Sequence, residues 1–405
     1  MASDTTPREA AVSGTTAEGS GPARKQRVLG RRARTAHPPQ TLAGAFDPRR
    51  NSLAMMRVGL AGVVAVAHAL STGFGWQPSL GGTDLSALAV DGFFVLSGFL
   101  VTRSLLRLRS VRRYAWHRLL RLLPGFWACL LVIALVLAPL AALLEGRDPG
   151  AVLTAGEDPA WRYVLVNAGL VIAQHGIADL ATPAGETALD GSLWTLQYEA
   201  ACYGAVAVLL AVAGLRAQRR VLAVACVVVW AALLLESVVH IPLEPPAFAN
   251  DQLLRFLLVF LLGAAGHVFA DRLPVRWTWA VASGAVVVAT AFLPDHRLPG
   301  AACFAYLCLY TVVRLPWRWT PSWDLSYGLY VYHWPVQFVL VLAGATGLGE
   351  WPFVVLSVAV SLCLAALSWV LVEGPALRLK DARWVGSARP VRSREPLTTP
   401  GRPGA

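Results

Sequence analysis

Charged residues are scarce in this sequence. Of its 405 residues, only 15% are charged and 56% are hydrophobic, and the mean hydropathy is +0.54. A soluble globular domain has about 25% charged residues, so these values exclude an ordinary soluble domain. Apolar runs of about 17 to 23 residues match the ~20 residues that a helix needs to cross a bilayer. We therefore expect an all-α, polytopic transmembrane bundle, because a membrane β-barrel would show alternating segments of about 10 residues.

The sequence also lacks paired cysteines, a signal peptide and internal repeats. None of the six cysteines forms a CxxC spacing, which excludes a thiol redox motif, and we expect neither a metal nor a bound cofactor. The first 50 residues contain no apolar core of the kind that a cleavable signal peptide needs. No repeat is visible, nor the pair of Gly/Pro-broken helices that is typical of many transporters.

Basic residues gather at the two ends of the chain. Residues 1–52 carry nine Arg or Lys against four Asp or Glu, and residues 376–405 carry seven against two, so each end has a net charge of +5. Neither end has the aromatic pattern of a nucleic-acid-binding segment, so we expect no nucleic-acid partner. We expect disordered basic tails at 1–52 and 379–405, beside anionic lipid, around a membrane domain at 53–378.

About ten segments are apolar enough to be transmembrane helices. They are expected at 53–71, 84–102, 122–144, 192–214, 221–239, 253–270, 277–293, 300–314, 325–343 and 352–372. Loops such as RAQRR and DRLPVR would then lie on one side, and acidic or neutral loops on the other. The positive-inside rule places both termini in the cytoplasm. The many arginines against two lysines indicate a GC-rich genome, and hence a bacterial cell membrane.

The longest outer connection, residues 145–191, contains the apolar run WRYVLVNAGLVIAQHG. This run is too short to span a bilayer, so we expect it to lie at the interface or to pack re-entrantly. There it could cap a site from outside.

Two costly side chains stand in the first apolar segment, MMRVGLAGVVAVAHAL. Arg57 and His68 are eleven residues apart, which puts both on one helix face about 16 Å from each other. An ionisable side chain inside a span costs ~2.5 to 3.5 kcal/mol and usually faces the bundle interior or a wet cavity. A structural explanation stands beside a functional one, since Arg57 could snorkel to the interface and His68 could bind a neighbouring helix.

Acids and hydroxyls follow in the next segments. Asp91 stands at the outer end of LAVDGFFVLSGFL, where we expect it to orient a neighbour such as His68, and Ser97 in its middle more often serves packing. In LDGSLWTLQYEAACYG, Glu199 lies inside an apolar segment and needs a partner, while Trp194 can belong to the aromatic belt.

Two further motifs carry candidate residues. The loop RSLLRLRSVRRYAWHRLLRLLP holds seven arginines, which the positive-inside rule can explain. The functional explanation is a site for an anionic ligand, because guanidinium groups bind phosphate bidentately. Its candidates are Arg113, Arg118 and Arg121, and Arg57 opens onto the same side. The segment LSYGLYVYHWPVQF adds Tyr330 and His333, of which a buried His333 is most often structural.

Together these motifs resemble the acyltransferase 3 family of integral membrane acyltransferases. The family's Arg, ten residues, then His matches Arg57 and His68. Its other motifs match DGFFVLSGFL at 91–100, HRLLRLLP with His117 in place of an arginine, GSLWTLQYE at 191–199, SYGLYVYHWP at 326–335 and EGP at 373–375. The resemblance covers about 53–378. One departure is LAMMR for the usual LDGLR, so Ala54 and Met55 replace an Asp and a Gly. The task of that acid, such as pairing the arginine or capping the helix, is then performed otherwise or not at all.

The resemblance implies transfer of an acyl group, commonly acetyl, from cytoplasmic acyl-CoA to a hydroxyl of a carbohydrate or of a glycosylated or polyketide metabolite. The arginines would hold the phosphates of acyl-CoA, and His68 would be the general base, oriented by Asp91 or Glu199. Ser97 and Tyr330 are candidate donors to the developing oxyanion. Trp194 and His333 are candidates for acceptor contact or structure.

Two questions stay open from the sequence. Direct transfer and an acyl-histidine intermediate are both compatible with the motifs, while a GxSxG elbow is absent. A transporter that exports a small anion or a glycan intermediate, with the same arginines as a gate, is the alternative from another class.

Overall fold

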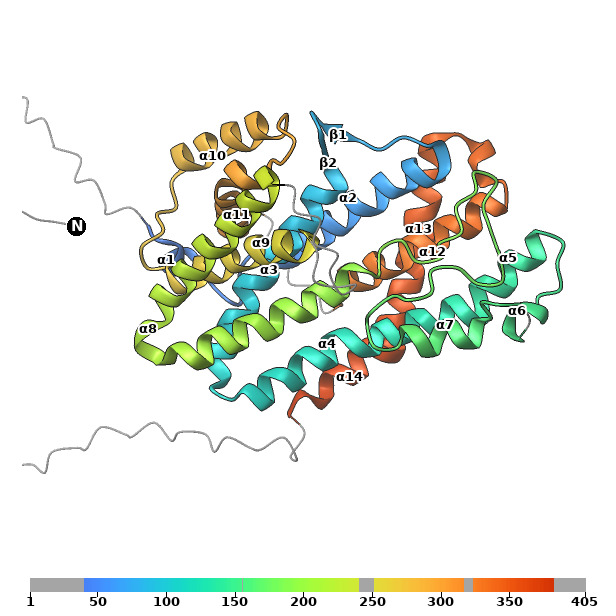
Figure 1. Ribbon diagram of the computed structural model, residues 1–405, viewed down its shortest axis with the longest axis horizontal. Coiled ribbons are helices and arrows are strands. Elements are labelled where there is room, and N and C mark those ends of the chain that lie inside the picture. The colour runs from blue at the N-terminus through green and yellow to red at the C-terminus, as the bar shows by residue number, and fades with distance from the viewer. Residues whose placement is uncertain (1–39, 155, 240–250, 317–322, 382–405) are drawn as a thin grey trace, which may run out of the picture. The chain divides into compact units, whose positions relative to one another are not determined.

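The computed structural model describes residues 40–154, 156–239, 251–316 and 323–381. The described part of the chain is a bundle of helices (Figure 1). Its main helices are α2 (Leu53–Phe74), α3 (Leu85–Leu108), α4 (Val111–Val132), α5 (Ala138–Leu144), α8 (Thr195–Val239), α9 (Asp251–Val268), α10 (Trp277–Thr290), α11 (Arg297–Arg314), α12 (Leu325–Leu342), α13 (Glu350–Ser368) and α14 (Gly374–Arg378).

The remaining elements are short. They are the helices α1 (Leu42–Ala45), α6 (Ala151–Thr154) and α7 (Ala160–Asn167), and a two-stranded antiparallel hairpin of β1 (Ser79–Leu80) and β2 (Thr83–Asp84). Two π-helical turns, η1 (Ile133–Leu137) and η3 (Trp369–Glu373), join α4 to α5 and α13 to α14.

The all-α expectation is confirmed, and every expected span falls on a helix. By length and composition, six helices among the described residues could cross a membrane. Large apolar side chains on the outside of the bundle, such as Val212 at 82% exposed and Trp277 at 70%, suit contact with lipid. The apolar helices thus indicate a multi-pass membrane protein, while the number of ten spans and the cytoplasmic termini stay predictions.

The fourth and fifth expected spans both lie within α8, and they correspond to two separate candidate membrane spans, Thr195–Ala213 and Ala217–Val239. Figure 1 shows that α8 changes direction between its two halves.

The connection at 145–191 does not span the bundle, as predicted. Its longest helix, α7, has eight residues, and the segment after α7 returns to the side of α4, where the Trp127 indole donates to the carbonyl of Ala168 at 2.9 Å. Trp127 lies roughly 25 Å from Leu144 at the far end of α5. The connection therefore reaches the middle of this long helix.

Two glycines allow α3 and α9 to pack backbone to backbone. A Cβ on Gly98 would lie 2.0 Å from the carbonyl oxygen of Phe260, and one on Gly263 would lie 2.0 Å from that of Val95. A side chain at either position would therefore push the helices apart. This pair of helices has the most extensive packing in the bundle and forms one wall of the site described below.

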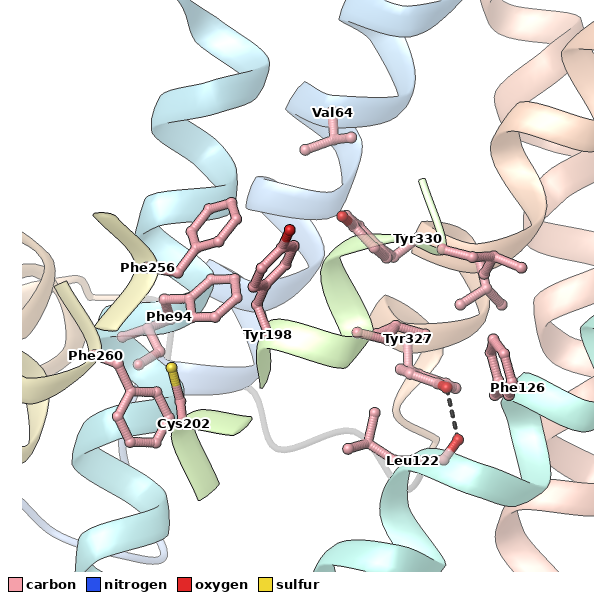
Figure 2. Packing of buried hydrophobic residues seen from close by; sticks show 14 of the residues in the cluster. Val64, Phe94, Leu122, Phe126, Tyr198, Cys202, Phe256, Phe260, Tyr327 and Tyr330 are labelled. Carbon is pink, nitrogen blue, oxygen red and sulfur yellow. Dashed lines mark hydrogen bonds between the residues drawn. The ribbon is translucent and has the colours of Figure 1, made fainter. Parts of the chain in front are cut away.

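Aromatic side chains from several helices fill the centre of the bundle (Figure 2). Phe94 of α3 stacks on Phe256 of α9 with ring centroids 4.3 Å apart, and Tyr198 of α8 packs beside Phe256 at 5.6 Å. On the other side, the Tyr327 hydroxyl of α12 donates to the carbonyl of Leu122 in α4 at 2.7 Å. These contacts hold α3, α4, α8 and α12 around a common interior.

Candidate active site

Helices α2 and α12 are joined by two polar contacts at different depths. Near the start of both helices, Arg57 Nη1 lies 2.7 Å from Asp324 Oδ2, which is the N-cap residue of α12. Further along both helices, His68 Nδ1 lies 2.8 Å from His333 Nε2. The pair Arg57 and His68 does share one helix face, and α12 supplies a partner for each.

The first contact belongs to an inner ionic cluster, which consists of Arg57, Asp324, Arg121 and Glu373. Arg121 of α4 binds Asp324 at 2.8 Å and Glu373, at the end of η3, at 3.4 Å. Glu373 is only 3% exposed, so its charge depends on this arginine. The cluster ties α2, α4, α12 and η3 together at one end of the bundle.

The same cluster accounts for the missing acid at position 54. Where the family has Asp, this chain has Ala54, yet Arg57 has the carboxylate of Asp324 as its partner. A helix-starting contact is also present, because the Asn51 side chain accepts from the backbone N–H of Leu53 at 3.1 Å. Arg57 thus has an acidic partner although position 54 carries no acid.

The hydrogen bonds of the histidine pair determine which nitrogens carry protons. His333 Nδ1 lies 3.2 Å from the carbonyl oxygen of Leu329, which can only accept, so His333 is protonated at Nδ1. The Nε2 of neutral His333 must then accept, and His68 donates to it from Nδ1. His68 therefore keeps the lone pair of its Nε2, which is the arrangement of a general base oriented by a second group.

A cavity of about 90 Å³ lies beside these contacts, between α2, α3, α4, α8 and α12. Three arginines, Arg57, Arg118 and Arg121, line it together with the hydroxyls of Ser97 and Thr195. Along α3 its lining runs from Val101 to Val90, which is about 16 Å of helix. It is therefore a long cavity with a cationic end.

Tyr330 and Phe93 close the other end of the cavity toward the histidines. Their rings meet edge to face at 5.8 Å, and the Tyr330 ring lies 6.0 Å from that of His333. The Tyr330 hydroxyl and Thr195 Oγ1 are 2.7 Å apart. Neither histidine is among the described residues that line the cavity, so Tyr330 is the link between cavity and base.

Glu199 faces the cavity but does not orient His68, which corrects the sequence-based expectation. Its Oε1 accepts hydrogen bonds from the Ser97 hydroxyl at 2.9 Å and from the Tyr203 hydroxyl at 2.5 Å. Tyr203 stands one helical turn after Glu199 on α8, so one helix face carries both groups. Glu199 is thus held by hydroxyls in the cavity wall.

Asp91 also binds a partner other than His68. Its carboxylate lies 2.8 Å from Arg297 Nε and 3.4 Å from His296 Nε2, at the start of α11, and Asp91 is 1% exposed. Thr83 extends this outer ionic cluster, since its hydroxyl lies 3.1 Å from His296 Nδ1. Asp91, His296 and Arg297 therefore join α3 to α11, and the expected contact with His68 is not formed.

Two other candidates lie away from the cavity. Arg113 stands in the first turn of α4, where its backbone N–H binds the N-cap Ser110, and Trp194 packs edge to face on Tyr198 at 5.7 Å. Neither is among the described residues that line the cavity. Arg118 and Arg121 do line it, as the sequence predicted for a site of positive charge.

The outer connection reaches the histidine pair through Trp334. The indole of Trp334 meets the His68 ring edge to face at 5.0 Å and donates to the carbonyl of Ala188 at 2.9 Å. Next to it, the Tyr163 hydroxyl binds the buried carboxylate of Asp190. Burial raises the pKa of Asp190 to about 7, although the hydrogen bond from Tyr163 opposes this shift. The segment expected to cap a site therefore touches a residue of that site.

Sequence reasoning missed Asp324, Arg297 and Tyr203. Asp324 stands two residues before Ser326, where the Ser–Tyr–Gly–Leu–Tyr motif begins, and an acid at a helix start is a recognisable N-cap signal. Arg297 stands in a short polar loop that resembles any other loop, so only the fold brings it to Asp91. Tyr203 follows Glu199 at helical spacing, which could have identified it as a neighbour.

Comparison with known proteins identifies the family of this chain. The chain matches the family model described as an acyltransferase domain over residues 50–370. It therefore belongs to the acyltransferase 3 family, and it is an acyltransferase of other than amino-acyl groups.

Two curated relatives cover nearly the whole chain. It is 28% identical to nodulation protein 10 of Rhizobium leguminosarum bv. viciae over 365 residues, which is 82% of this chain and 95% of that protein. It is 24% identical to an O-acetyl transferase of Shigella phage Sf6 over 352 residues, with the same shares. No solved structure matches the chain.

Proposed function

We propose that this protein transfers an acyl group, acetyl in the first instance, from acyl-CoA to a hydroxyl of a carbohydrate or of a glycosylated or polyketide acceptor. The observation that carries the proposal is the hydrogen-bond chain from Leu329 through His333 to His68, which leaves a basic Nε2 on His68. The name of the phage relative, O-acetyl transferase, supports acetyl as the group and oxygen as the acceptor atom.

The charged groups at one end of the cavity suit the donor. Acyl-CoA carries several phosphates, and Arg57 and Arg121 offer guanidinium groups at this end of the cavity. With both termini in the cytoplasm, this end opens toward the side where acyl-CoA is made. The thioester arm would then extend along α3 toward Tyr330.

The reaction needs two proton transfers, one to His68 and one from it, and one exchange of bonds. His68 Nε2 takes the proton of the acceptor hydroxyl while the oxygen attacks the thioester carbonyl carbon. The C–S bond breaks, and the CoA thiolate leaves and takes up the proton that His68 holds, which returns His68 to its neutral form. The positive charge that His68 gains is stabilised by its hydrogen bond to His333, and Tyr330 can donate its hydroxyl to the developing oxyanion.

Membrane vesicles that contain the full chain test this proposal. With radiolabelled acetyl-CoA, wild-type vesicles should release free CoA thiol and gain base-labile acetyl ester, whereas His68→Ala vesicles should do neither. His175→Ala changes an exposed histidine of the outer connection and should behave as wild type. Full activity of His68→Ala would refute the proposal, and flux of an anion without release of CoA would favour a transporter.

A further inference from the structure

An apolar groove opens between α4 and the first half of α8. It has a volume of about 390 Å³, and its lining includes Leu119, Leu122 and Leu123 of α4 and Ala200, Gly204 and Ala207 of α8. Leu119 is 48% exposed, so the groove faces the outside of the bundle, where a membrane protein meets lipid.

Small residues on α8 create this groove. Ala200, Gly204 and Ala207 recur at helical spacing on one face, and a Cβ on Gly204 would have no heavy atom within 4 Å. The leucines of α4 cannot fill the space that these residues leave. Along α4 the lining runs from Val111 to Leu123, about 18 Å, which exceeds half of the ~30 Å hydrocarbon core of a bilayer.

The groove and the cavity of the active site share one wall. Arg118, Leu122 and Tyr203 line both. The Arg118 guanidinium lies over the Tyr203 ring at 5.7 Å, and among the described residues no carboxylate forms an ion pair with it. An arginine has an apolar stem and a charged end, so this side chain can face hydrocarbon and a polar cavity at once.

We propose that the groove binds the hydrocarbon chain of a lipid-borne acceptor, whose phosphate-linked, hydroxyl-bearing head enters the cavity beside Arg118. This inference rests on the proposed transfer to a hydroxyl. Charge complementarity selects the ligand class, because a lipid phosphate supplies the anion that Arg118 lacks among the described residues. An acceptor from water would not need an apolar groove that adjoins the cavity from the lipid side.

Photo-crosslinking in vesicles tests the groove. The full chain is reconstituted in phosphatidylcholine vesicles that hold a trace of one diazirine-labelled probe. The probe is either phosphatidylglycerol, which has a net negative charge and free hydroxyls, or equally labelled phosphatidylcholine, which is zwitterionic and has no free hydroxyl. The phosphatidylglycerol probe should label the groove about fivefold more than the phosphatidylcholine probe. Arg118→Gln should remove this preference and leave labelling at the phosphatidylcholine level.

Matched substitutions on α8 separate the groove from the general lipid surface. Gly204→Leu and Ala207→Leu fill the groove and should each lower labelling by the phosphatidylglycerol probe at least fivefold. Ala211→Leu, on an exposed position outside the lining, should leave labelling unchanged. Binding of labelled acetyl-CoA to the same vesicles shows that each variant is folded.

Three results would overturn the inference. Equal labelling by both probes would mean that bulk lipid occupies the groove, and labelling that Gly204→Leu and Ala207→Leu do not lower would place the probe elsewhere. Labelling displaced by palmitoyl-CoA but not by unlabelled phosphatidylglycerol would assign the groove to the acyl chain of the donor. If the wild-type protein neither binds acetyl-CoA nor releases CoA, the proposed function is refuted, whatever the cross-links show.

Discussion

The inner and outer ionic clusters both pair arginines with carboxylates, but only the inner cluster lines a cavity. The outer cluster surrounds the Asp91 carboxylate with Arg297 and His296, and Asp91 is 1% exposed. The inner cluster pairs Arg57 and Arg121 with Asp324, yet its arginines line a cavity together with Arg118 and Glu199. One network is closed on itself, whereas the other presents charge to an open space.

This difference separates charges that hold helices together from charges that can bind a ligand. A buried charge whose partners are all supplied by the protein joins helices and has little left to offer a ligand. Arg118 and Glu199 have no ion-pair partner among the described residues, and both contact Tyr203 in the cavity wall. Asp91 and Glu199 were both candidates for orienting His68. The structure places Asp91 in the outer ionic cluster and Glu199 in the wall of the cavity.

Removing the base should have the largest effect on activity. His68→Ala should lower kcat by about 1000-fold while the protein still inserts and folds, because general-base catalysis supplies about 100- to 10,000-fold. The measurement is CoA release in reconstituted vesicles. His333→Gln, whose amide oxygen can accept from His68 Nδ1, should retain more activity than His333→Ala. Equal loss in both His333 variants would mean that the hydrogen bond does not position the base.

Opening the outer cluster should lower stability rather than catalysis. Asp91→Ala leaves Arg297, which is 9% exposed, without its carboxylate, and breaking a buried pair costs about 3 to 5 kcal/mol. Thermal unfolding in detergent measures the loss, and kcat per folded molecule should stay at the wild-type value.

An apolar replacement of the whole outer pair sharpens this test. Asp91→Leu combined with Arg297→Met should recover much of the lost stability, because no buried charge remains without a partner. A large fall in kcat of this folded double variant would show that Asp91 takes part in the reaction.

Replacing the arginine of the inner pair should separate its two tasks. Arg57→Ala should raise KM for acetyl-CoA about tenfold if the guanidinium binds a phosphate. Arg57→Lys keeps a cation beside Asp324, so stability should stay near that of the wild type, while KM stays high because an ammonium group does not bind phosphate bidentately. An unchanged KM in Arg57→Ala would reduce the pair to a structural contact.

The outer connection should show the smallest effect, as a dependence of its local stability on pH. The pKa of Asp190 is raised from 3.8 to about 7 by burial, so the folded protein holds this proton more tightly than the unfolded chain. Its contribution to stability is full below about pH 4 and is lost as the pH rises through about 7. Hydrogen exchange of peptides from 160–192 should therefore be slower, by about tenfold after correction for intrinsic rates, at pH 5 than at pH 8.

Asp190→Asn is the matched control for this pH effect. It keeps the size of the side chain and an oxygen that can accept from Tyr163, but it does not titrate. Its exchange should not change between these pH values beyond the intrinsic correction. An unchanged pH dependence in this variant would assign the effect to another group.

The sequence by itself determined the helical class, the lipid-facing composition and the positions of most site residues. These follow from local physics, because an apolar run of about 20 residues has few alternatives to a helix in a membrane, and charges inside such runs are too costly to be incidental. For this reason Arg57, His68, Glu199 and the arginines of α4 could be named from their surroundings in the chain alone.

Only the tertiary structure decided which of these residues meet. Arg57 and Asp324 are 267 residues apart in the chain, and Asp91 and Arg297 are 206 apart. No local pattern encodes such pairs, because helix packing sets them, down to the glycines that let α3 and α9 touch. The sequence could name the acids, but the fold assigned Asp91 to a closed ion pair, Glu199 to a cavity wall and His333 to the base.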